Sequence, residues 1–574
     1  MHIHDVLIVG AGPCGLAVAA RLREHTPSAT FTDDEHQRYH WIKKHGRCMN
    51  IRNYKTGRDS LNRPSPSSRS SNYESHGEAR GVEQGVDILV LDAEGAAWMV
   101  RWQRLFKAFE IDYLRSPMFF HVDPADRDAL LGYAYEKERE KELQALPGCV
   151  GKEVSKHRQK KKWKTVRRMS QGGPDVDERD RKDYYTPSNN LFEAHCNEVV
   201  RRYGLRDGLI RQERVTSINY EALTYFYGEN ESNDTVDDPL DNLTKIFRVS
   251  TDRGAHLARV VVLAVGPGNS PSIPPVLGIE SSNIHEGYTH AMQIKQLPPP
   301  HVMSKIQARK PTNLLIVGGG LTSVQLTDVV VKRGVDRVHL LMRGPLKVKY
   351  FDIELDWIGK FRNINQAVFW SADSDEERFK MISEARNGGS ITPRYRKILD
   401  AHVKTGKVSL HTFTELRSVS WDAHAKTWNK LTSSPMVEFP PIDFIIFATG
   451  VHTNVSKIPF MQSFIQRHPT DMVGGLPCLN DDLMWSNDVP LFITGRLAGL
   501  RLGPGAPNLV GARVGAERIA WNVEDVLRKL RSHKRSFGSG EREDDEDGGI
   551  ERLREYVAGR RNRFDTLINV FEEE

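Results

Sequence analysis

The sequence of 574 residues lacks the patterns that mark a disulfide-stabilised or membrane-spanning protein. Its five cysteines, Cys14, Cys48, Cys149, Cys196 and Cys478, form no Cys-x-x-Cys pair, which argues against a dithiol redox centre or a zinc ribbon. Isolated cysteines suit a reducing compartment, and no charged and then apolar leader precedes the first strand, so we expect a cytoplasmic protein. The longest apolar runs, such as Val260–Val265, have the length of strands, and no membrane span is expected.

The charge pattern gives no sign of a nucleic-acid partner. The chain has 81 basic and 75 acidic residues, and the net charge of +6 is a mild excess. The basic run Lys156–Arg168 is followed at once by acids within Asp175–Asp180, so we interpret it as a solvated surface insertion. No spacing typical of metal ligands appears, and no Ser/His/Asp set marks a catalytic residue. The chemistry is therefore expected to come from a bound cofactor.

The first informative pattern is a glycine turn near the start of the chain. The apolar run Asp5–Val9 leads into Gly10-x-Gly12-x-x-Gly15, and Leu16–Arg23 follows with helical composition. Gly10 permits a tight turn, Gly12 lets the backbone approach a pyrophosphate, and Gly15 lets the helix pack on the strand. Phosphates would meet N–H groups at the helix N-terminus, where the helix dipole favours anions. The pattern predicts a dinucleotide site.

A dinucleotide fold continues with a second strand that ends in an acid, and this acid binds a ribose hydroxyl. Ala29–Thr32 fits the strand, and Asp33 fits the acid, twenty-three residues after Gly10. Asp34 and Glu35 are nearby rivals for the same role.

The glycine pattern occurs a second time in the middle of the chain. The strand Asn313–Val317 leads into Gly318-x-Gly320-x-x-Ser323 and a helix. The next strand, Arg337–Met342, ends at Arg343 and not at an acid. A carboxylate there would repel a 2′-phosphate, whereas a guanidinium binds it with charge-assisted hydrogen bonds. The second site is therefore predicted to bind NADPH, with Lys347 and Lys349 as additional positive charges.

Two dinucleotide folds in one chain imply electron transfer between two cofactors, and the first site, with its acid, suits the adenosine of FAD. Two further stretches, Arg259–Pro275 and Asp443–Asn454, each run from a buried-type strand into a glycine turn, the second at Gly450. Strand and glycine turns of this kind commonly return a chain to a flavin domain after an excursion.

The last glycine turn lies near the C-terminus. A strand, Leu491–Thr494, leads through a Gly-rich loop into a helix that starts near Asn508. The N-terminus of this helix would face the pyrimidine edge of the flavin, where N–H groups stabilise negative charge on the reduced ring.

The chain resembles the two-dinucleotide-binding flavoproteins, and within them the class B flavin monooxygenases of the ornithine and lysine N-hydroxylase type. The resemblance lies in the glycine turns Gly10–Gly15 and Gly318–Ser323, the segment Trp102–Phe120, the acid-and-aromatic insertion Tyr350–Ile391, and Ala448–Gly450. A weaker resemblance is to the oxidative-stress-induced growth inhibitor proteins.

The resemblance implies two substrate-binding residues. Lys107 falls where that family's Lys holds the substrate carboxylate, and Asn387 falls where its Asn lies near the substrate and the nicotinamide. The sequence departs from the family at two positions. The flavin-facing Gln before the Lys is not evident, since Trp102 or Gln103 occupies that region, and Arg496 stands where an Asp usually contacts the ribityl chain.

These patterns predict an α/β fold with two Rossmann-like domains, the NADPH domain inserted in the FAD domain, a β-meander and long polar insertions. We expect the first part of the FAD domain over 1–310, with mobile insertions at about 55–85 and 150–185. The NADPH domain is expected over 311–440, the return to the FAD domain over 441–532, and a charged tail over 533–574.

The first hypothesis for function is an NADPH-dependent FAD monooxygenase. It would use molecular oxygen to hydroxylate a small-molecule nucleophile, such as an ornithine-like amine, or to oxidise a carbonyl. Two alternatives stay open. One is an NADPH oxidoreductase that passes electrons to another acceptor, and the other is a non-catalytic, redox-regulated flavoprotein of growth or stress control.

Overall fold

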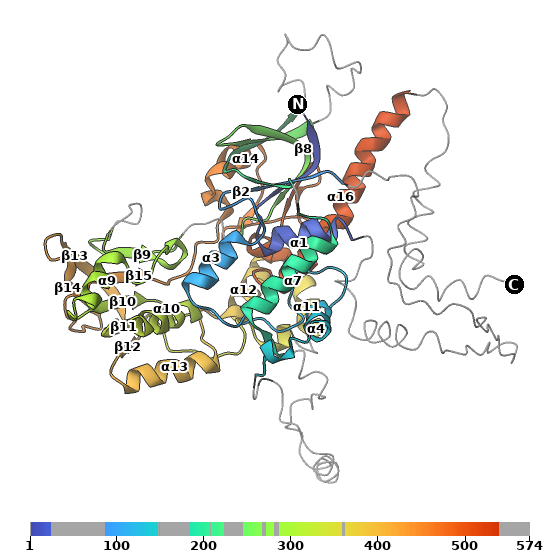
Figure 1. Ribbon diagram of the computed structural model, residues 1–574. Helices are drawn as coiled ribbons and strands as arrows, with labels where there is room; N and C mark the ends of the chain where they lie inside the picture. Colours follow the sequence, from blue (N-terminus) through green and yellow to red (C-terminus); the bar gives the residue numbers. More distant parts are fainter. Residues whose placement is uncertain are drawn as a thin grey trace, which may run out of the picture.

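A computed structural model of the chain describes residues 2–24, 86–146, 149, 184–206, 208–222, 245–266, 271–279, 286–358 and 362–538, the last nine as backbone only. Two mainly parallel sheets, each with its own helices, organise these residues into two halves that lie side by side (Figure 1). The expected insertion at 55–85 lies outside the described residues, and so does most of the one at 150–185.

The first sheet is built around β1 and has the strand order β18-β19-β8-β1-β2-β5, with β7 and β6 continuing from β8. Its central strands are nearly continuous apolar runs because both of their faces are buried, as in other parallel sheets. The antiparallel strands β6, β7 and β8 form the expected β-meander. The bounds are β1 (Ile3–Val9), β2 (Ile88–Asp92), β5 (Ile210–Gln212), β6 (Val215–Ala222), β7 (Lys245–Thr251), β8 (Ala255–Leu263), β18 (Met484–Ser486) and β19 (Val489–Ile493).

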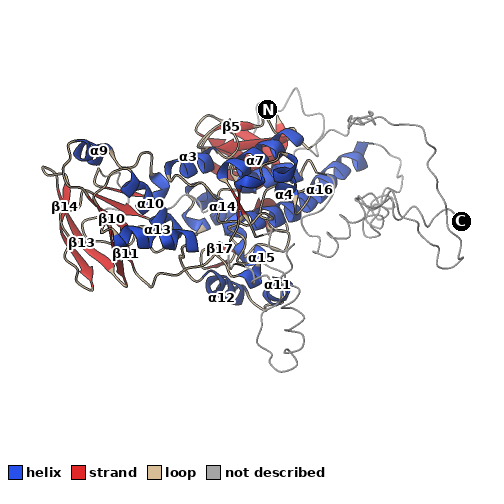
Figure 2. Ribbon diagram, turned by 60° about the horizontal axis from the view of Figure 1, so that its bottom comes forward, coloured by secondary structure: helices blue, strands red, loops and turns tan. Residues whose placement is uncertain are grey.

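The second sheet is parallel throughout and has the order β12-β11-β10-β15-β9. A separate hairpin of β13 and β14 packs near it, at the far end of the molecule from the first sheet (Figure 2). The bounds are β9 (Tyr288–His290), β10 (Asn313–Val317), β11 (Arg337–Met342), β12 (Val408–Thr412), β13 (Glu415–Asp422), β14 (Thr427–Ser434) and β15 (Phe444–Phe447).

Helices cover both sheets, and two of them join distant parts of the chain. Helix α1 packs along α16, where Arg21 Nε donates to Glu517 Oε2 at 2.6 Å in a fully buried ion pair. Helix α3 lies between the two halves (Figure 1), since Trp102 packs on the first core and Phe109 belongs to the second. The longer helices are α1 (Pro13–Arg21), α3 (Val100–Ala108), α4 (Ala129–Glu136), α7 (Asn189–Arg202), α9 (Pro300–Gln307), α10 (Leu321–Lys332), α11 (Arg362–Trp370), α12 (Asp375–Arg386), α13 (Pro393–Lys404) and α16 (Leu509–Gly538).

The α/β fold with two Rossmann-like halves is confirmed, and the sheets refine the expected boundaries. Strand β9 was expected in the first part of the FAD domain, but it pairs with β15 in the second sheet. Strand β15 was expected to begin the return to the FAD domain, but it pairs with β10. The chain therefore leaves the second sheet only after Phe447, and α16 continues through the expected start of the tail to Gly538.

A buried polar cluster ties α7 and α16 to the first half. His195 on α7 and Arg513 on α16 are both buried beside His121, and the two histidine rings lie 5.4 Å apart. Asp123 accepts a hydrogen bond from Arg202 at 2.7 Å. Burial lowers the pKa of His195 to about 4, so the cluster holds a neutral imidazole.

Candidate functional site: two glycine turns and a cavity

The first glycine turn combines close packing with one open position. Gly10 has φ +110°, and a Cβ there would lie 2.6 Å from the carbonyl oxygen of Ala264. A Cβ on Gly15 would lie 2.0 Å from the carbonyl oxygen of Gly10, so the helix packs on the strand only without a side chain. Among the described residues, apart from its chain neighbours and the nearby backbone of its own helix, no atom lies within 4 Å of the position that a Cβ of Gly12 would take. The turn is therefore closed on the protein side and open at Gly12.

The N-terminus of α1 is suited to an anion. Gly12 is the N-cap residue, no side chain caps the helix, and no acid stands in its first turn. The positive end of the helix dipole is thus left without a carboxylate of the helix's own first turn. A pyrophosphate that approached Gly12 would meet this helix end, so the geometry fits the phosphates of a dinucleotide.

An acid does stand at the end of the strand beside β1, but it is Asp92. Strand β2 pairs in parallel with β1, with Val9 opposite Leu91, and Asp92 is its last residue. One carboxylate oxygen of Asp92 accepts the backbone N–H of Ala11, inside the glycine turn, at 2.8 Å. Asp33 and the strand expected before it lie outside the described residues. The run Ile88–Asp92 carries the same signal in the sequence, an apolar strand that ends in an acid, but 81 positions separate Asp92 from Ala11.

The second glycine turn repeats the first with one substitution. Gly318 has φ +153°, and a Cβ there would lie 2.3 Å from the carbonyl oxygen of Ala448. Gly320 is the N-cap residue of α10, and it too has no side-chain cap and no acid in the first helical turn. Ser323 stands in place of the third glycine and is buried, and its hydroxyl donates to the carbonyl of Gly320 at 2.7 Å.

The basic residues after β11 do not all serve the same purpose. Arg343 directly follows β11 and is exposed at the end of that strand. Lys347 instead donates to both the backbone carbonyl and the side-chain oxygen of Asn387, each at 2.9 Å. Lys349 forms an ion pair with Glu354 at 2.6 Å. Of the three, Arg343 is the one that directly follows a strand of the second sheet and is exposed.

The structure brings Asn387 to the second glycine turn but places Lys107 elsewhere. Asn387 ends α12 with φ +46°, and a Cβ on nearby Gly389 would lie 2.9 Å from the Cα atom of Gly320. The loop after α12 therefore lies against the second turn. Lys107 lies on α3 with its side chain exposed, and it is not among the residues that line the cavity described next.

A cavity of about 190 Å³ lies against the core of the first half. The segment 115–120, the start of α16 and the loop after β11 contribute to it, and the Phe120 and Phe351 side chains in its wall both belong to that core. The lining residues are Arg115, Ser116, Pro117, Phe120, Phe351, Asp352 and Asn508. Asn508 donates to one oxygen of Asp352 at 3.1 Å, and Arg386 donates to the other at 2.9 Å.

Arg115 fixes the wall of this cavity and was not recognised as a site residue from the sequence. It donates to the backbone carbonyls of four residues, and also to the hydroxyl of Ser390 at 2.8 Å. Burial lowers its pKa to about 10. The guanidinium thus joins the first half to two segments of the second. The four carbonyls belong to Lys349, Tyr350, Phe351 and Ser390.

Arg496 lies beside the first glycine turn, where the family pattern has an acid. A Cβ on Gly495, the residue before it, would lie 3.1 Å from Cys14 Sγ in the first turn of α1. The pKa of Arg496 is lowered mainly by burial and also by the nearby charge of Arg386. The turn at Gly450, with φ +83°, accepts the backbone N–H of Ser272 at 3.0 Å, so the two return turns of the chain lie together.

The fold of this chain is similar to that of flavin-dependent monooxygenases of known structure. The FAD-bound cadaverine monooxygenase of Erwinia amylovora superposes with a TM-score of 0.54 at 15% identity, over 92% of this chain and 95% of that one. The ornithine N-hydroxylase of Kutzneria sp. 744, solved with reduced FAD, NADP⁺ and L-ornithine, gives 0.55 at 13% identity, over 92% and 100%. The chain therefore has the fold of the class B flavin monooxygenases, as the resemblance in sequence implies.

Two curated relatives are similar in sequence over shorter stretches. An uncharacterized oxidoreductase of Bacillus velezensis is 31% identical over 131 residues, which are 23% of this chain and 31% of that protein. One of Geobacillus kaustophilus is 29% identical over 222 residues, 37% of this chain and 53% of that protein. The chain thus spans about a third to a half of the length of these relatives. No protein-family model matches it, and no helix in its described part could cross a bilayer.

Proposed function

We propose that the protein is an NADPH-dependent FAD monooxygenase that oxidises a small amine-bearing molecule with molecular oxygen. One observation carries the proposal: Gly12 and Gly320 each stand at the N-terminus of a helix that no side chain caps, one in each half, and open space lies beside Gly12. A cavity lies against the core of the first half. When bound, FAD would supply hydride acceptance from NADPH and the activation of oxygen.

On the FAD side, each part of the cofactor has a partner among the described residues. The N-terminus of α1 would hold the pyrophosphate, and Asp92 would bind the adenosine ribose. Arg496 would add a positive charge near the phosphates, in place of the family's acid. The N-terminus of α16 near Asn508 would stabilise negative charge on the reduced ring.

On the NADPH side, the N-terminus of α10 would hold the pyrophosphate at Gly320. Arg343 would bind the 2′-phosphate, because it follows the strand whose end meets the adenosine ribose in this kind of fold. Asn387 lies in the loop against the same turn, so its role near the nicotinamide is compatible with its place. Its side-chain oxygen is already held by Lys347, which orients the amide.

The cavity suits a small zwitterionic substrate, because Arg115 and Asp352 place a guanidinium and a carboxylate in its wall. Asp352 is already bound to Arg386 and Asn508, so the ammonium ion of a substrate would replace one of these two partners. Solved structures with this fold include enzymes named for cadaverine, ornithine and lysine, all of which carry a terminal amine. We assign the recognition of the amine to Asp352. Lys107, which the resemblance implies would hold the substrate carboxylate, does not line this cavity.

The decisive experiment measures whether the electrons of NADPH reach the hydroxylated amine or hydrogen peroxide. Purified protein with FAD is reduced by NADPH without oxygen and then mixed with oxygen and an amine: L-ornithine, L-lysine or cadaverine. We expect hydroxylated amine in proportion to the NADPH consumed. The variant Asp352→Asn keeps the shape of the side chain. Its FAD should still be reduced by NADPH, but a larger share of the oxygen should be released as hydrogen peroxide.

Each alternative function gives a different result. If one hydrogen peroxide is formed from oxygen for each NADPH oxidised, with every amine, the result would favour an oxidoreductase with another electron acceptor. A protein that binds no FAD, or whose FAD is not reduced by NADPH, would favour a non-catalytic role.

We also propose a cytoplasmic location. The described cysteines Cys14, Cys149, Cys196 and Cys478 are free, which supports this proposal.

A further inference from the structure

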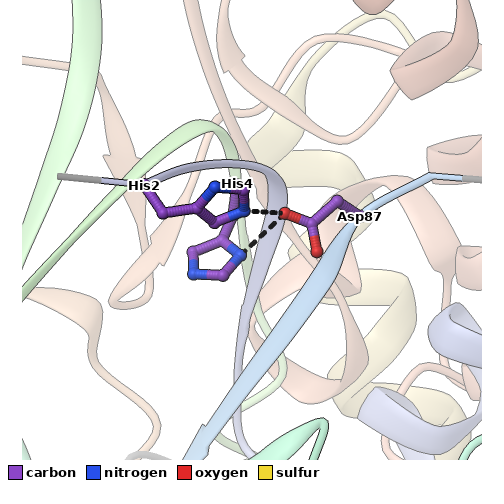
Figure 3. Close-up of side chains that lie close together, drawn as sticks. All are labelled: His2, His4 and Asp87. Atoms are coloured by element: carbon purple, nitrogen blue, oxygen red, sulfur yellow. Dashed lines mark hydrogen bonds and ion pairs between the residues drawn. The ribbon is translucent and has the colours of Figure 1, made fainter.

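Three side chains of the kinds that bind transition metals meet where β1 and β2 begin, at the end of the first sheet opposite the glycine turn. His2 directly precedes β1 and His4 is its second residue, so the alternation of the extended chain directs both side chains to the same face. Asp87 lies directly before β2 and points between the two imidazole rings (Figure 3). Spacing along the chain does not reveal this group, because 83 positions separate His4 from Asp87.

The three donor atoms are close enough to share one cation. His2 Nε2 and His4 Nδ1 lie 2.7 and 2.9 Å from the same oxygen, Oδ2 of Asp87, and one donor atom from each residue lies within 4.8 Å of the others. A tetrahedral zinc ion with bonds of about 2.0–2.2 Å holds such donors roughly 3.3 Å apart. Small rotations of the side chains would therefore exchange the two hydrogen bonds for metal–ligand bonds.

The backbone holds this arrangement in place, and solvent reaches it from one side. The N–H of Val6 donates to the carbonyl of Asp87 at 3.0 Å, and the N–H of Asp87 donates to a carboxylate oxygen of Asp5 at 3.2 Å. The side chain of His4 is 14% exposed, whereas those of Asp87 and His2 are 43% and 70% exposed. His4 and Asp87 are thus held by the backbone of the sheet, and the exposed side of the group leaves room for water as a fourth ligand.

We infer that His2, His4 and Asp87 bind a divalent late transition cation, represented by Zn²⁺. Two imidazoles and one carboxylate suit Zn²⁺, Cu²⁺ or Ni²⁺, whereas Mg²⁺ and Ca²⁺ prefer oxygen ligands. The six residues from His4 to Gly10 span about 20 Å at the rise of a strand, so the cation would lie far from the flavin. It would join the start of β1 to the start of β2 and close the long connection between them, which stabilises the folded first half.

The test uses the full chain without an affinity tag, freed of metal with a chelator and titrated with Zn²⁺ in a calorimeter. We expect one Zn²⁺ per chain and a rise in the unfolding temperature of the protein. The variants His2→Ala, His4→Ala and Asp87→Ala should each weaken binding by at least about tenfold. Mg²⁺ should not compete. His2 is largely exposed, so its variant removes a ligand without disturbing the core, and circular dichroism verifies the fold.

His256 supplies the matched control. It lies close to His4 and also binds a carboxylate, with Nε2 at 2.7 Å from Oε2 of Glu213, but it does not belong to the three-donor group. His256→Ala should leave Zn²⁺ binding unchanged, and all four variants should keep FAD binding and NADPH oxidation. Equal losses with His256→Ala, or Zn²⁺ affinity unchanged in the His4 and Asp87 variants, would overturn the assignment without touching the proposed redox function.

Discussion

The two glycine turns follow the same backbone path but differ in what surrounds them. In the first, Gly15 has no room for a side chain, whereas the second accommodates Ser323 with a hydrogen bond to its own turn. The strand beside the first turn ends in Asp92, and the strand beside the second ends before the exposed Arg343. The turn itself therefore predicts a phosphate site, and the residue at the end of the neighbouring strand distinguishes the two adenosine ends.

The largest effect is expected where the turns differ in packing. Gly15→Ala places a Cβ about 2.0 Å from a backbone carbonyl, so we expect a loss of about 3 kcal/mol or more in the free energy of unfolding of the first half. Ser323→Ala removes one hydrogen bond and should cost about 1 kcal/mol. Denaturant unfolding of both variants measures the difference. Similar small losses in both would show that the first turn relaxes easily.

The next effect separates the two cofactors without disturbing the fold. Gly12→Asp and Gly320→Asp both place a carboxylate at a helix N-cap, which favours the helix by about 1 kcal/mol but repels a phosphate. Gly12→Asp should lose FAD, while Gly320→Asp should keep FAD and no longer be reduced by NADPH. Flavin absorbance and anaerobic reduction measure these outcomes. FAD retained in the Gly12 variant would contradict the first assignment.

Arg343→Ala addresses the preference for the 2′-phosphate. A hydrogen bond to a charged group contributes about 1.5–3 kcal/mol, so the KM for NADPH should rise by one to two orders of magnitude. The KM for NADH should change little, because NADH has no 2′-phosphate. The matched control is Lys347→Ala, whose ammonium is already bound to Asn387. Equal changes for the two nucleotides in the Arg343 variant would refute the assignment.

Asp92→Asn and Asp33→Asn decide which acid binds the ribose of FAD. The amide introduced by Asp92→Asn would keep an oxygen for the N–H of Ala11 but lose the negative charge, so we expect FAD affinity to fall roughly tenfold. Asp33→Asn should leave the affinity unchanged if Asp92 holds the ribose. The Kd of FAD for the apoprotein measures both. The opposite pattern would restore Asp33 to the role that the sequence predicts.

The smallest difference concerns pH. Burial lowers the pKa of His195 in the first half and of His339 in the second to about 4, below the ordinary value of 6.5. The unfolded chain therefore binds protons that the folded chain does not, and stability present above pH 6.5 is lost as the pH falls toward 4. The free energy of unfolding of both halves should fall as the pH is lowered over this range. Unfolding followed from about pH 7.5 to about pH 4.5 measures it, and His339→Gln should reduce the loss in the second half only.

Local signals were enough to find both glycine turns, but they did not find the hydrogen bond between Asp92 and the first turn. Strands β10 and β11 match the expected ranges. The connection from α10 to β11 is short, so the strand that comes next in the sequence is also the strand that pairs with β10. In the first half, residues 25–85 stand between α1 and β2, and a rule based on spacing stops at Asp33 long before Asp92. The cavity was missed for a similar reason, since Arg115, Asp352 and Asn508 come from three distant segments.

Two glycine turns with the spacing of phosphate-binding turns, and an Arg instead of an acid directly after the strand that follows the second turn, can be found from the sequence alone. They depend on local rules: a tight turn leaves no room for a Cβ, and a carboxylate repels a phosphate whereas a guanidinium attracts it. The three-dimensional fold was needed to show which acid stands beside Gly12, that β9 and β15 belong to the second sheet, and that His2 and His4 meet Asp87. Those facts depend on strand order, which parallel pairing sets between segments of any separation along the chain.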